Sequence, residues 1–235
     1  MSIKNVLFDL DGTLLPMDME EFTNGYFAML TQKLAPHGYD PKKLVDAVWA
    51  GTGAMVKNDG SRTNEAAFWA RFVQIFGEES LKDIPLFEEF YGNEFQRAKK
   101  FCGYNPLAAK AVRTIRESGR RVALATNPIF PAIATGSRLR WVGLEPSDFE
   151  LCTTYEDCHY CKPNVNYYRE VLDKLDMRAE DCLMVGNDMT EDTAAAELGV
   201  QVFIISDCLI NKEGKDLNAW PHGGFEDLIR FVCGE

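Results

Sequence analysis

The sequence predicts an α/β fold in which helices cover a parallel sheet and a further group of helices is inserted after the first strand. Five short runs rich in Val, Ile, Leu and Phe are spaced along the chain, at residues 3–8, 121–126, 149–153, 182–186 and 200–205. Helical patterns separate the later runs, and this alternation is typical of parallel strands that are buried on both faces. We therefore expect a Rossmann-like parallel β-sheet core flanked by helices.

The first apolar run ends in Asp9-Leu10-Asp11-Gly12-Thr13. Alternate residues of a strand face the same side, so the carboxylates of Asp9 and Asp11 repel each other unless a cation lies between them. Gly12 permits a tight bend and the close approach of a ligand, and Thr13 adds a hydroxyl. Taken alone, the segment also fits an ordinary Asp-Gly turn.

Residues 16–105 predict an all-helical domain between the first two strands. Aromatic and aliphatic residues recur there every three or four positions, which is the spacing of a helix face packed against a core. They are Phe22, Tyr26, Leu30 and Leu34, then Phe68, Trp69, Phe72, Ile75 and Phe76, and then Phe87, Phe90, Tyr91 and Phe95. Residues 1–15 and 106–235 then form the α/β core, with the helical domain over the carboxyl edge of its sheet, where such folds bind ligands.

The rest of the core alternates helices with strands. One helix is expected from Pro106 to just before Gly119, and another over residues 164–175, because both segments carry an apolar stripe at helical spacing. The tail from Cys208 onward is interpreted as a loop and a short helix, with a turn at Gly223-Gly224 before Phe225.

The later strands also end in polar residues. Thr126 and Asn127 follow the second strand, Lys162 precedes the next helical pattern, and Asn187, Asp188 and Asp192 follow the fourth strand. Each group taken singly fits a helix cap or a surface lysine. Together they give one edge of a parallel sheet carboxylates, a hydroxyl and an ammonium in the order Asp-x-Asp, Thr, Lys, Asp.

This constellation resembles the haloacid dehalogenase superfamily, in its phosphatase-like branch with a helical cap between the first and second motifs. The resemblance implies a Mg²⁺-dependent phosphatase that hydrolyses a small phosphorylated metabolite through an aspartyl-phosphate intermediate. Dehalogenases of this fold lack an aspartate two positions after the nucleophile, because a halide leaves without protonation. The presence of Asp11 therefore favours phosphoryl transfer.

The resemblance also implies a role for each residue. The catalytic residues are Asp9 as nucleophile, Asp11 as general acid and base, Thr126 and Lys162, and the phosphate is bound by Gly12, Thr126, Asn127 and Lys162. The metal ligands are Asp9, the main-chain carbonyl of Asp11, and Asp188. Many relatives have an acid where this chain has Asn187. Asp188 is expected to touch the metal, Asn187 is a possible outer-shell residue that could also offer its amide oxygen, and Asp192 is either an outer-shell residue or bonded to Lys162. Which of the three residues touches the metal stays open.

The part of the substrate beyond the phosphate is expected to contact the polar, Gly-rich segment inside the helical domain. Thr52, Lys57, Asn58 and Arg62 are the candidates for substrate specificity, and the alternative is an inter-helix loop in which Thr63 or Asn64 caps the next helix. Two other functions stay open, a sugar phosphomutase of the same superfamily and a non-catalytic binding or regulatory protein that retains the fold.

Composition excludes several other classes of protein. The 46% hydrophobic content is enough for a core, and the net charge of −11 argues against binding nucleic acid or anionic lipid. No basic leader precedes an apolar segment, and no run approaches the roughly 20 apolar residues of a membrane span, so we expect a cytoplasmic location. Seven cysteines are interpreted as free thiols, and Cys158 and Cys161 lack the second ligand pair of a structural zinc site.

Overall fold

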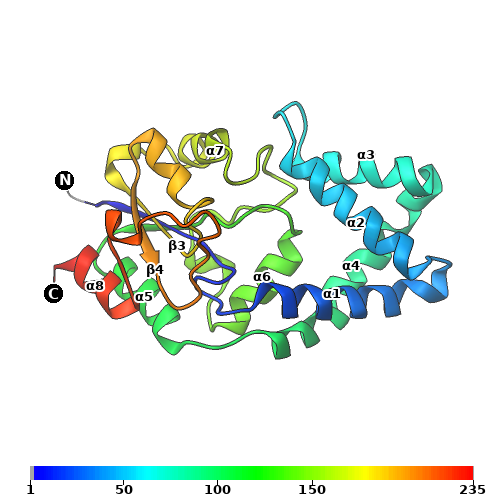
Figure 1. The fold of residues 1–235 in the computed structure, drawn as a ribbon, viewed down its shortest axis with the longest axis horizontal. Helices are drawn as coiled ribbons and strands as arrows, with labels where there is room; N and C mark the ends of the chain where they lie inside the picture. Colours follow the sequence, from blue (N-terminus) through cyan, green and yellow to red (C-terminus); the bar gives the residue numbers. More distant parts are fainter. Residues whose placement is uncertain (1–2, 235) are drawn as a thin grey trace.

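The structure is a computed structural model that describes residues 3–234, and its centre is a five-stranded parallel sheet (Figure 1). The strands lie in the order β2-β1-β3-β4-β5. They are β1 (Asn5–Phe8), β2 (Arg121–Leu124), β3 (Cys182–Gly186), β4 (Gln201–Ile205) and β5 (His222–Gly223). The predicted Rossmann-like α/β fold is confirmed. Residues 1–2 and 235, which the predicted core includes, lie outside the described residues.

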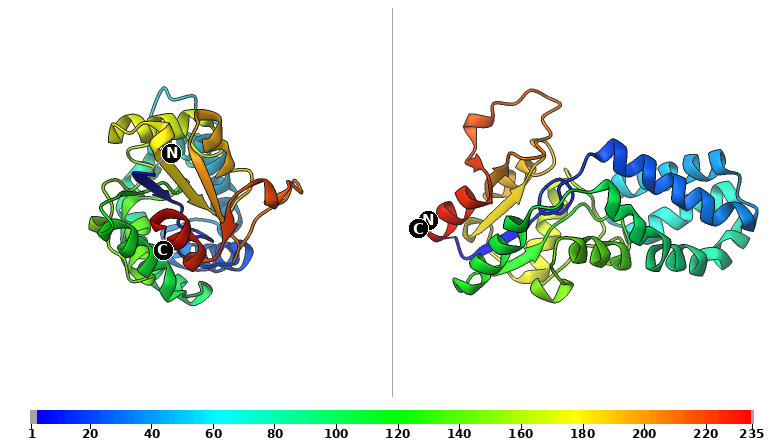
Figure 2. Two further views of the ribbon diagram at one scale, coloured as in Figure 1. Left: turned by 90° about the vertical axis from the view of Figure 1, so that its left-hand side faces the viewer. Right: turned by 90° about the horizontal axis from the view of Figure 1, so that it is seen from below.

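Helices cover both faces of the sheet because side chains alternate along each strand. Val6 and Phe8 of β1 join the cluster formed with α5 (Pro106–Glu117), α6 (Ala132–Trp141) and α8 (Phe225–Cys233), whereas Leu7 packs on the opposite face with α7 (Val165–Leu175). Short 3₁₀ helices connect these elements at Pro146–Asp148, Ala179–Asp181, Thr193–Leu198 and Leu217–Ala219. The carboxyl ends of the strands all face the inserted helices (Figure 2).

Two predicted elements of the core were wrong in detail. Residues 149–153 do not form a strand: they pair with β2 through one bridge, between Leu124 and Cys152, before the chain turns toward Lys162. Gly223 lies not in a turn but in the two-residue strand β5, where it pairs with Ile205. Both segments are at sheet edges, where a few main-chain hydrogen bonds decide between strand and loop.

The insertion between β1 and β2 is helical. It contains α1 (Met19–Leu34), α2 (Pro41–Val56), α3 (Asn64–Phe76) and α4 (Ile84–Gly92), with 3₁₀ helices at Ala35–His37, Glu78–Asp83 and Glu94–Phe101. The two connecting segments lie side by side, since the Gly103 amide donates to the Pro16 carbonyl at 2.7 Å. A domain boundary near residues 15 and 105 stays a prediction. Within residues 3–234, none of the helices combines the length and the apolar character that a membrane crossing requires.

A second set of contacts joins the inserted helices to the core at the start of α3. The buried Asn64 side chain donates to the carbonyls of Pro128 at 3.2 Å and Tyr160 at 3.3 Å, and its main-chain amide donates to the Cys158 carbonyl at 2.7 Å. Thr63 caps the helix by accepting from the Ala66 amide. The segment between α2 and α3 therefore holds the helices against the core.

Two helical glycines give opposite predictions for stability. A methyl group at Gly25 of α1 would lie 2.1 Å from the Phe101 ring, whereas one at Gly53 of α2 would meet no atom within 4 Å. We expect Gly25→Ala to lower the free energy of unfolding by about 1–3 kcal/mol, because the helices must move apart. Gly53→Ala should raise it by about 0.5–1 kcal/mol, the usual gain in helix propensity. Urea denaturation of both variants checks this, and equal shifts would contradict the close packing of α1.

Candidate active site

Asp9 lies directly after β1, buried at the carboxyl edge of the sheet, and both of its carboxylate oxygens are held. The Lys162 ammonium donates to Oδ1 at 3.0 Å, and the Thr13 hydroxyl donates to Oδ2 at 3.0 Å. The Asp9 side chain is 10% exposed. The sequence-predicted nucleophile and lysine, 153 residues apart in the chain, are thus brought into direct contact.

Lys162 also contacts a second carboxylate. Its ammonium donates to Asp192 Oδ1 at 2.7 Å, and both side chains are almost completely buried. Burial alone lowers the pKa of Lys162, but Asp192 and Asp9 raise it by more, so the pKa lies well above its ordinary value. The charged ammonium group of Lys162 therefore lies next to Asp9, and Asp192 binds the same ammonium group.

Asn187 and Asp188 follow β3 but contact different groups. The Asn187 amide oxygen accepts from the Thr13 hydroxyl at 3.0 Å, and its Nδ2 donates to the Cys208 carbonyl at 2.7 Å. Asp188 Oδ1 instead accepts from the amides of Thr190 and Glu191, at 2.7 and 2.9 Å. Asn187, rather than Asp188, therefore lies beside the group that contacts Asp9.

Two glycines allow these close approaches. Gly12 has φ +81°, and a Cβ there would lie 2.3 Å from Asn187 Nδ2. A Cβ at Gly186 would lie 2.0 Å from Asp192 Oδ2, the oxygen that accepts from the Asp188 amide. Side chains at either position would force the segment after β3 away from Asp9.

Thr126 and Asn127 lie beyond the end of β2, where hydrogen bonds from two side-chain hydroxyls hold the main chain. The Thr126 carbonyl accepts from the Thr153 hydroxyl at 2.7 Å and from the Tyr167 hydroxyl at 2.8 Å. Asn127 Oδ1 accepts from the Lys162 amide at 3.2 Å, and its Nδ2 donates to both oxygens of Glu191 at 3.2 Å. These contacts place Asn127 in the same network as Lys162, with Thr126 as its neighbour in the chain.

Glu191 is a carboxylate in this network that sequence reasoning did not single out. Burial is the main reason that its pKa rises to about 7; Lys162 opposes the rise, and the carboxylates of Asp192, Asp9 and Asp188 add to it. The sequence did not single out Glu191, because a glutamate is common in the first turn of a helix.

Arg138 of α6 is the other residue that sequence reasoning missed. It is 1% exposed, its guanidinium forms an ion pair with Asp11 Oδ2, and it lies 4.4 Å from the centre of the Phe130 ring. Asp11 Oδ1 is buried and makes no hydrogen bond within residues 3–234. An arginine therefore holds one of the two carboxylate oxygens of Asp11.

The oxygen atoms near Asp9 were tested as a possible metal site. In the described part of the chain, no three His, Cys, Asp or Glu side chains are placed to hold a metal ion. The predicted ligands, Asp9, the main-chain carbonyl of Asp11 and Asp188, include only two such side chains and stay a prediction. Carbonyl and amide oxygens are also ligands of hard cations. The Asn187 amide oxygen is linked to Asp9 through Thr13, and the Asp11 carbonyl accepts none of the main-chain hydrogen bonds found between residues 3 and 234. These oxygen donors suit Mg²⁺ better than a soft metal.

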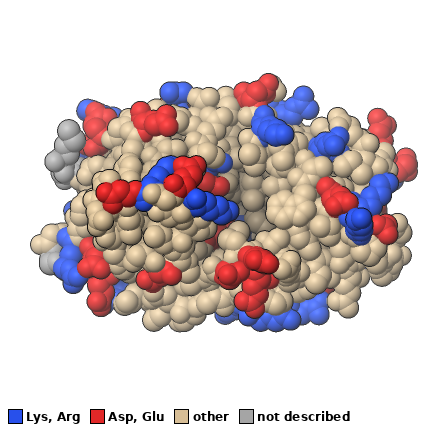
Figure 3. Space-filling view, in the orientation of Figure 1, with Lys and Arg blue, Asp and Glu red and all other residues tan. Residues whose placement is uncertain are grey.

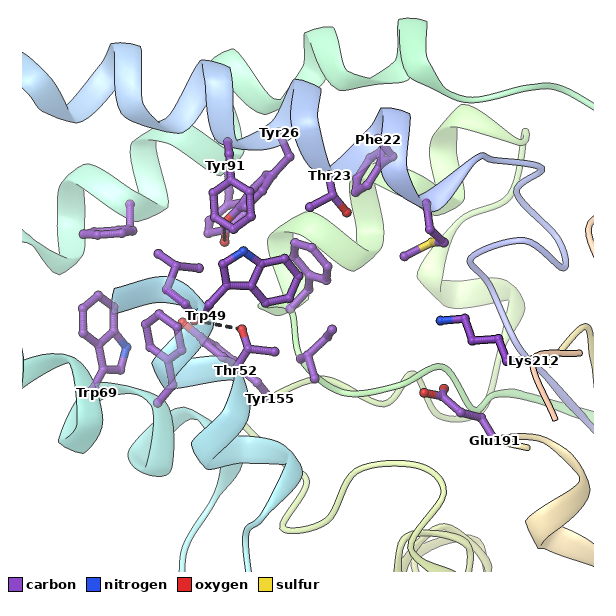
Figure 4. Close-up of a pocket in the computed structure, with 17 residues that line it drawn as sticks. Phe22, Thr23, Tyr26, Trp49, Thr52, Trp69, Tyr91, Tyr155, Glu191 and Lys212 are labelled. Atoms are coloured by element: carbon purple, nitrogen blue, oxygen red, sulfur yellow. Dashed lines mark hydrogen bonds between the residues drawn. The ribbon is translucent and has the colours of Figure 1, made fainter. Parts of the chain in front are cut away.

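The four candidates for substrate specificity do not share one surface. Thr52 lines a cavity of about 400 Å³ between the inserted helices and the core, and its hydroxyl donates to the Val48 carbonyl (Figure 4). Lys57, Asn58 and Arg62 instead surround a separate hollow, where Asn58 Nδ2 donates to the Arg62 carbonyl and to Asn64 Oδ1. Asn58 therefore supports the loop, and only Thr52 of the four reaches the large cavity.

Cys158 and Cys161 are both buried, free thiols. Burial raises the pKa of each thiol to about 12, and Cys161 Sγ accepts from Asn64 Nδ2 at 3.4 Å. They therefore contribute to the contact between α3 and the core as protonated thiols.

Comparisons with known proteins show the family and the fold. A family model described as haloacid dehalogenase-like hydrolase matches residues 3–199. The pyrophosphatase PpaX of Halalkalibacterium halodurans is 23% identical over 206 residues, which cover 87% of this chain and 84% of that protein.

Solved structures share the fold over almost the whole chain. A 2-haloacid dehalogenase from Pseudomonas syringae superposes with a TM-score of 0.65 at 19% identity, covering 97% of this chain and 99% of that one. A predicted phosphoglycolate phosphatase from Haemophilus somnus gives 0.62 at 18%, and YfnB from Bacillus subtilis, bound to magnesium, gives 0.56 at 17%; each covers 99% of both chains. Because the family model spans most of the sequence, the chain belongs to the haloacid dehalogenase-like hydrolases.

Proposed function

We propose that this hydrolase is a Mg²⁺-dependent phosphatase that cleaves a small phosphorylated metabolite through an aspartyl-phosphate on Asp9. The observation that carries the proposal is the buried Asp9 carboxylate between Lys162 and Thr13, with a second acid, Asp11, two residues later. The similarity to a pyrophosphatase and to a predicted phosphoglycolate phosphatase supports it.

The charge of the phosphate determines what the site must supply. A carboxylate about 4 Å from a group of roughly two negative charges meets about 8 kcal/mol of repulsion at an effective dielectric constant near 20. Lys162 opposes this repulsion, and Thr126 and the main chain around Asn127 would bond the remaining phosphate oxygens, with Gly12 letting the main chain approach. The attack forms the bond from Asp9 to phosphorus and breaks the bond to the leaving alcohol.

Asp11 then moves the protons. Arg138 holds Oδ2, and the unpartnered Oδ1 is the oxygen that gives a proton to the leaving alcohol and later takes one from the attacking water. Asp9, the Asp11 carbonyl and Asn187 are the residues that would hold Mg²⁺, which supplies further positive charge opposite the phosphate. The inserted helices serve as a cap that excludes water and selects the substrate.

Replacing the nucleophile tests the reaction. We expect Asp9→Asn to lower the turnover of p-nitrophenyl phosphate by at least about 10³-fold, because the amide cannot form the acyl phosphate. Asp173→Asn, on the exposed side of α7, is the matched control and should keep wild-type turnover. Equal rates from Asp9→Asn and wild type would end the proposal and leave a non-catalytic binding protein. Release of chloride from 2-chloropropionate, or an isomer instead of free phosphate from a sugar phosphate, would replace it with a dehalogenase or a phosphomutase.

The metal ligands are tested by exchanging an acid and an amide at adjacent positions. Asn187→Asp should lower the Mg²⁺ concentration for half-maximal activity about tenfold, because it adds a carboxylate beside Asp9. Asp188→Asn should change that concentration less than about twofold, since its Oδ1 still accepts the two amides that it caps. Circular dichroism checks that both fold, and a large loss of Mg²⁺ affinity in Asp188→Asn would reinstate Asp188 as the ligand.

The ion pair of Asp11 is tested on α6. Arg138→Met should reduce the free energy of unfolding by about 3 kcal/mol and lower kcat, because it leaves Asp11 without its cation. Arg140 lies on the same helix as Arg138 and forms an exposed ion pair with Glu145. Arg140→Met should leave both quantities near wild type. Equal effects of the two substitutions, measured by urea denaturation and initial rates, would show that Arg138 does not hold Asp11.

A further inference from the structure

The cavity between the inserted helices and the core is mainly aromatic. Ten of its seventeen lining residues are Phe, Tyr or Trp, contributed by α1 to α4 and by core segments near residues 130 and 155 (Figure 4). The space-filling view shows a recess between the two parts of the molecule (Figure 3). A volume of about 400 Å³ is sufficient for a small ring system.

The cavity begins next to the proposed phosphate site. Ile129 and Phe130, which line it, follow Asn127 by two and three residues. Glu191 also lines it and accepts both hydrogen bonds from Asn127 Nδ2. A phosphate bound at Asn127 and Lys162 would therefore have its ester group directed toward the aromatic walls.

Charge is confined to one end of this cavity. Its charged lining residues are Glu191 and Lys212, both on the core, and Figure 4 shows them at the end opposite Trp69. Lys212 is the cation among the described residues that line the cavity, and it lies at the core end. A second phosphate or a carboxylate placed among the aromatic walls would lose its hydration without a cation beside it.

The polar groups of the aromatic end lie against other parts of the protein. The Tyr26 and Tyr91 hydroxyls bond each other at 2.9 Å. The Trp69 indole N–H lies beside the Tyr155 hydroxyl and is buried. This end of the cavity therefore offers a ligand mainly aromatic contact.

We propose, on the basis of the phosphatase function above, that the substrate is the phosphate ester of a neutral alcohol with an aromatic ring. The phosphate binds at Asp9, and the ring is buried among the aromatic side chains of α1 to α4. A quaternary ammonium also binds to aromatic faces, and Glu191 would favour it. Glu191 lies at the core end beside Lys212, so the aromatic end has no carboxylate to pair with a cation, which favours the neutral ring. The two are separated by experiment.

A matched series of 2-substituted ethyl phosphates tests the substrate class, because all share a primary alcohol as leaving group. The substituents are hydrogen, phenyl, trimethylammonium and a second phosphate. We expect kcat/KM for 2-phenylethyl phosphate to exceed that for ethyl phosphate about 50-fold, the factor for burying one phenyl ring. Phosphocholine and the bisphosphate should not exceed ethyl phosphate.

Variants of α2 locate the effect. Trp49 lines the cavity although its side chain is 53% exposed, so its truncation is compatible with folding, and Val56 is an exposed residue of the same helix outside the cavity. The ratio of kcat/KM for 2-phenylethyl over ethyl phosphate should fall at least about fivefold in Trp49→Ala and stay at its wild-type value in Val56→Ala. Tryptophan fluorescence of the wild-type protein should also change on titration with 2-phenylethanol but not with ethanol.

The outcomes separate the two proposals. Equal kcat/KM for the four esters, or preference for phosphocholine or the bisphosphate, overturns the aromatic substrate and leaves the phosphatase intact. An unchanged ratio in Trp49→Ala overturns the placement of the ring in this cavity. If neither these esters nor p-nitrophenyl phosphate is hydrolysed, the phosphatase fails, and the aromatic substrate fails with it.

Discussion

A buried ammonium between two buried carboxylates is the interaction on which this site depends. Lys162 binds Asp9 and Asp192, which come from opposite ends of the chain, so the ends of β1 and β3 and the segment before α7 must all be in place. Removing the lysine would leave two carboxylates facing each other in a poorly hydrated region, which is costly. In the proposed reaction, the same charge that stabilises the folded core would also prepare Asp9 to meet the phosphate.

The fold was largely predictable because buried parallel strands have a strong pattern. Runs such as 182–186 are apolar at every position, and α7 begins and ends within a residue or so of its predicted range. The pattern fails where pairing is short: residues 149–153 are as apolar as a strand, yet one bridge joins them to β2. His222 and Gly223 carry no strand pattern, and only the neighbouring β4 makes them a strand.

The contact between Asp9 and Lys162 was predictable, because Asp9 directly follows β1 and Lys162 lies in the segment before α7, at the same edge of the sheet. The two side chains after β3 point in different directions: Asn187 contacts Thr13, and Asp188 contacts the amide of Thr190. The sequence alone could not decide which of the two points toward Thr13. Arg138 was not predictable, because an arginine in the last turn of a helix is usually exposed and favourable to the helix dipole. Its burial depends on tertiary contacts with Asp11 and Phe130.

Phe130 lines the cavity and packs against the Arg138 guanidinium, which in turn holds Asp11. A molecule that shifts this ring must also disturb the cation beside it. In the proposed phosphatase, recognition of the organic part of the substrate and the orientation of Asp11 are therefore linked through one aromatic side chain, so a poorly fitting ester would meet a misaligned acid as well as weak contacts.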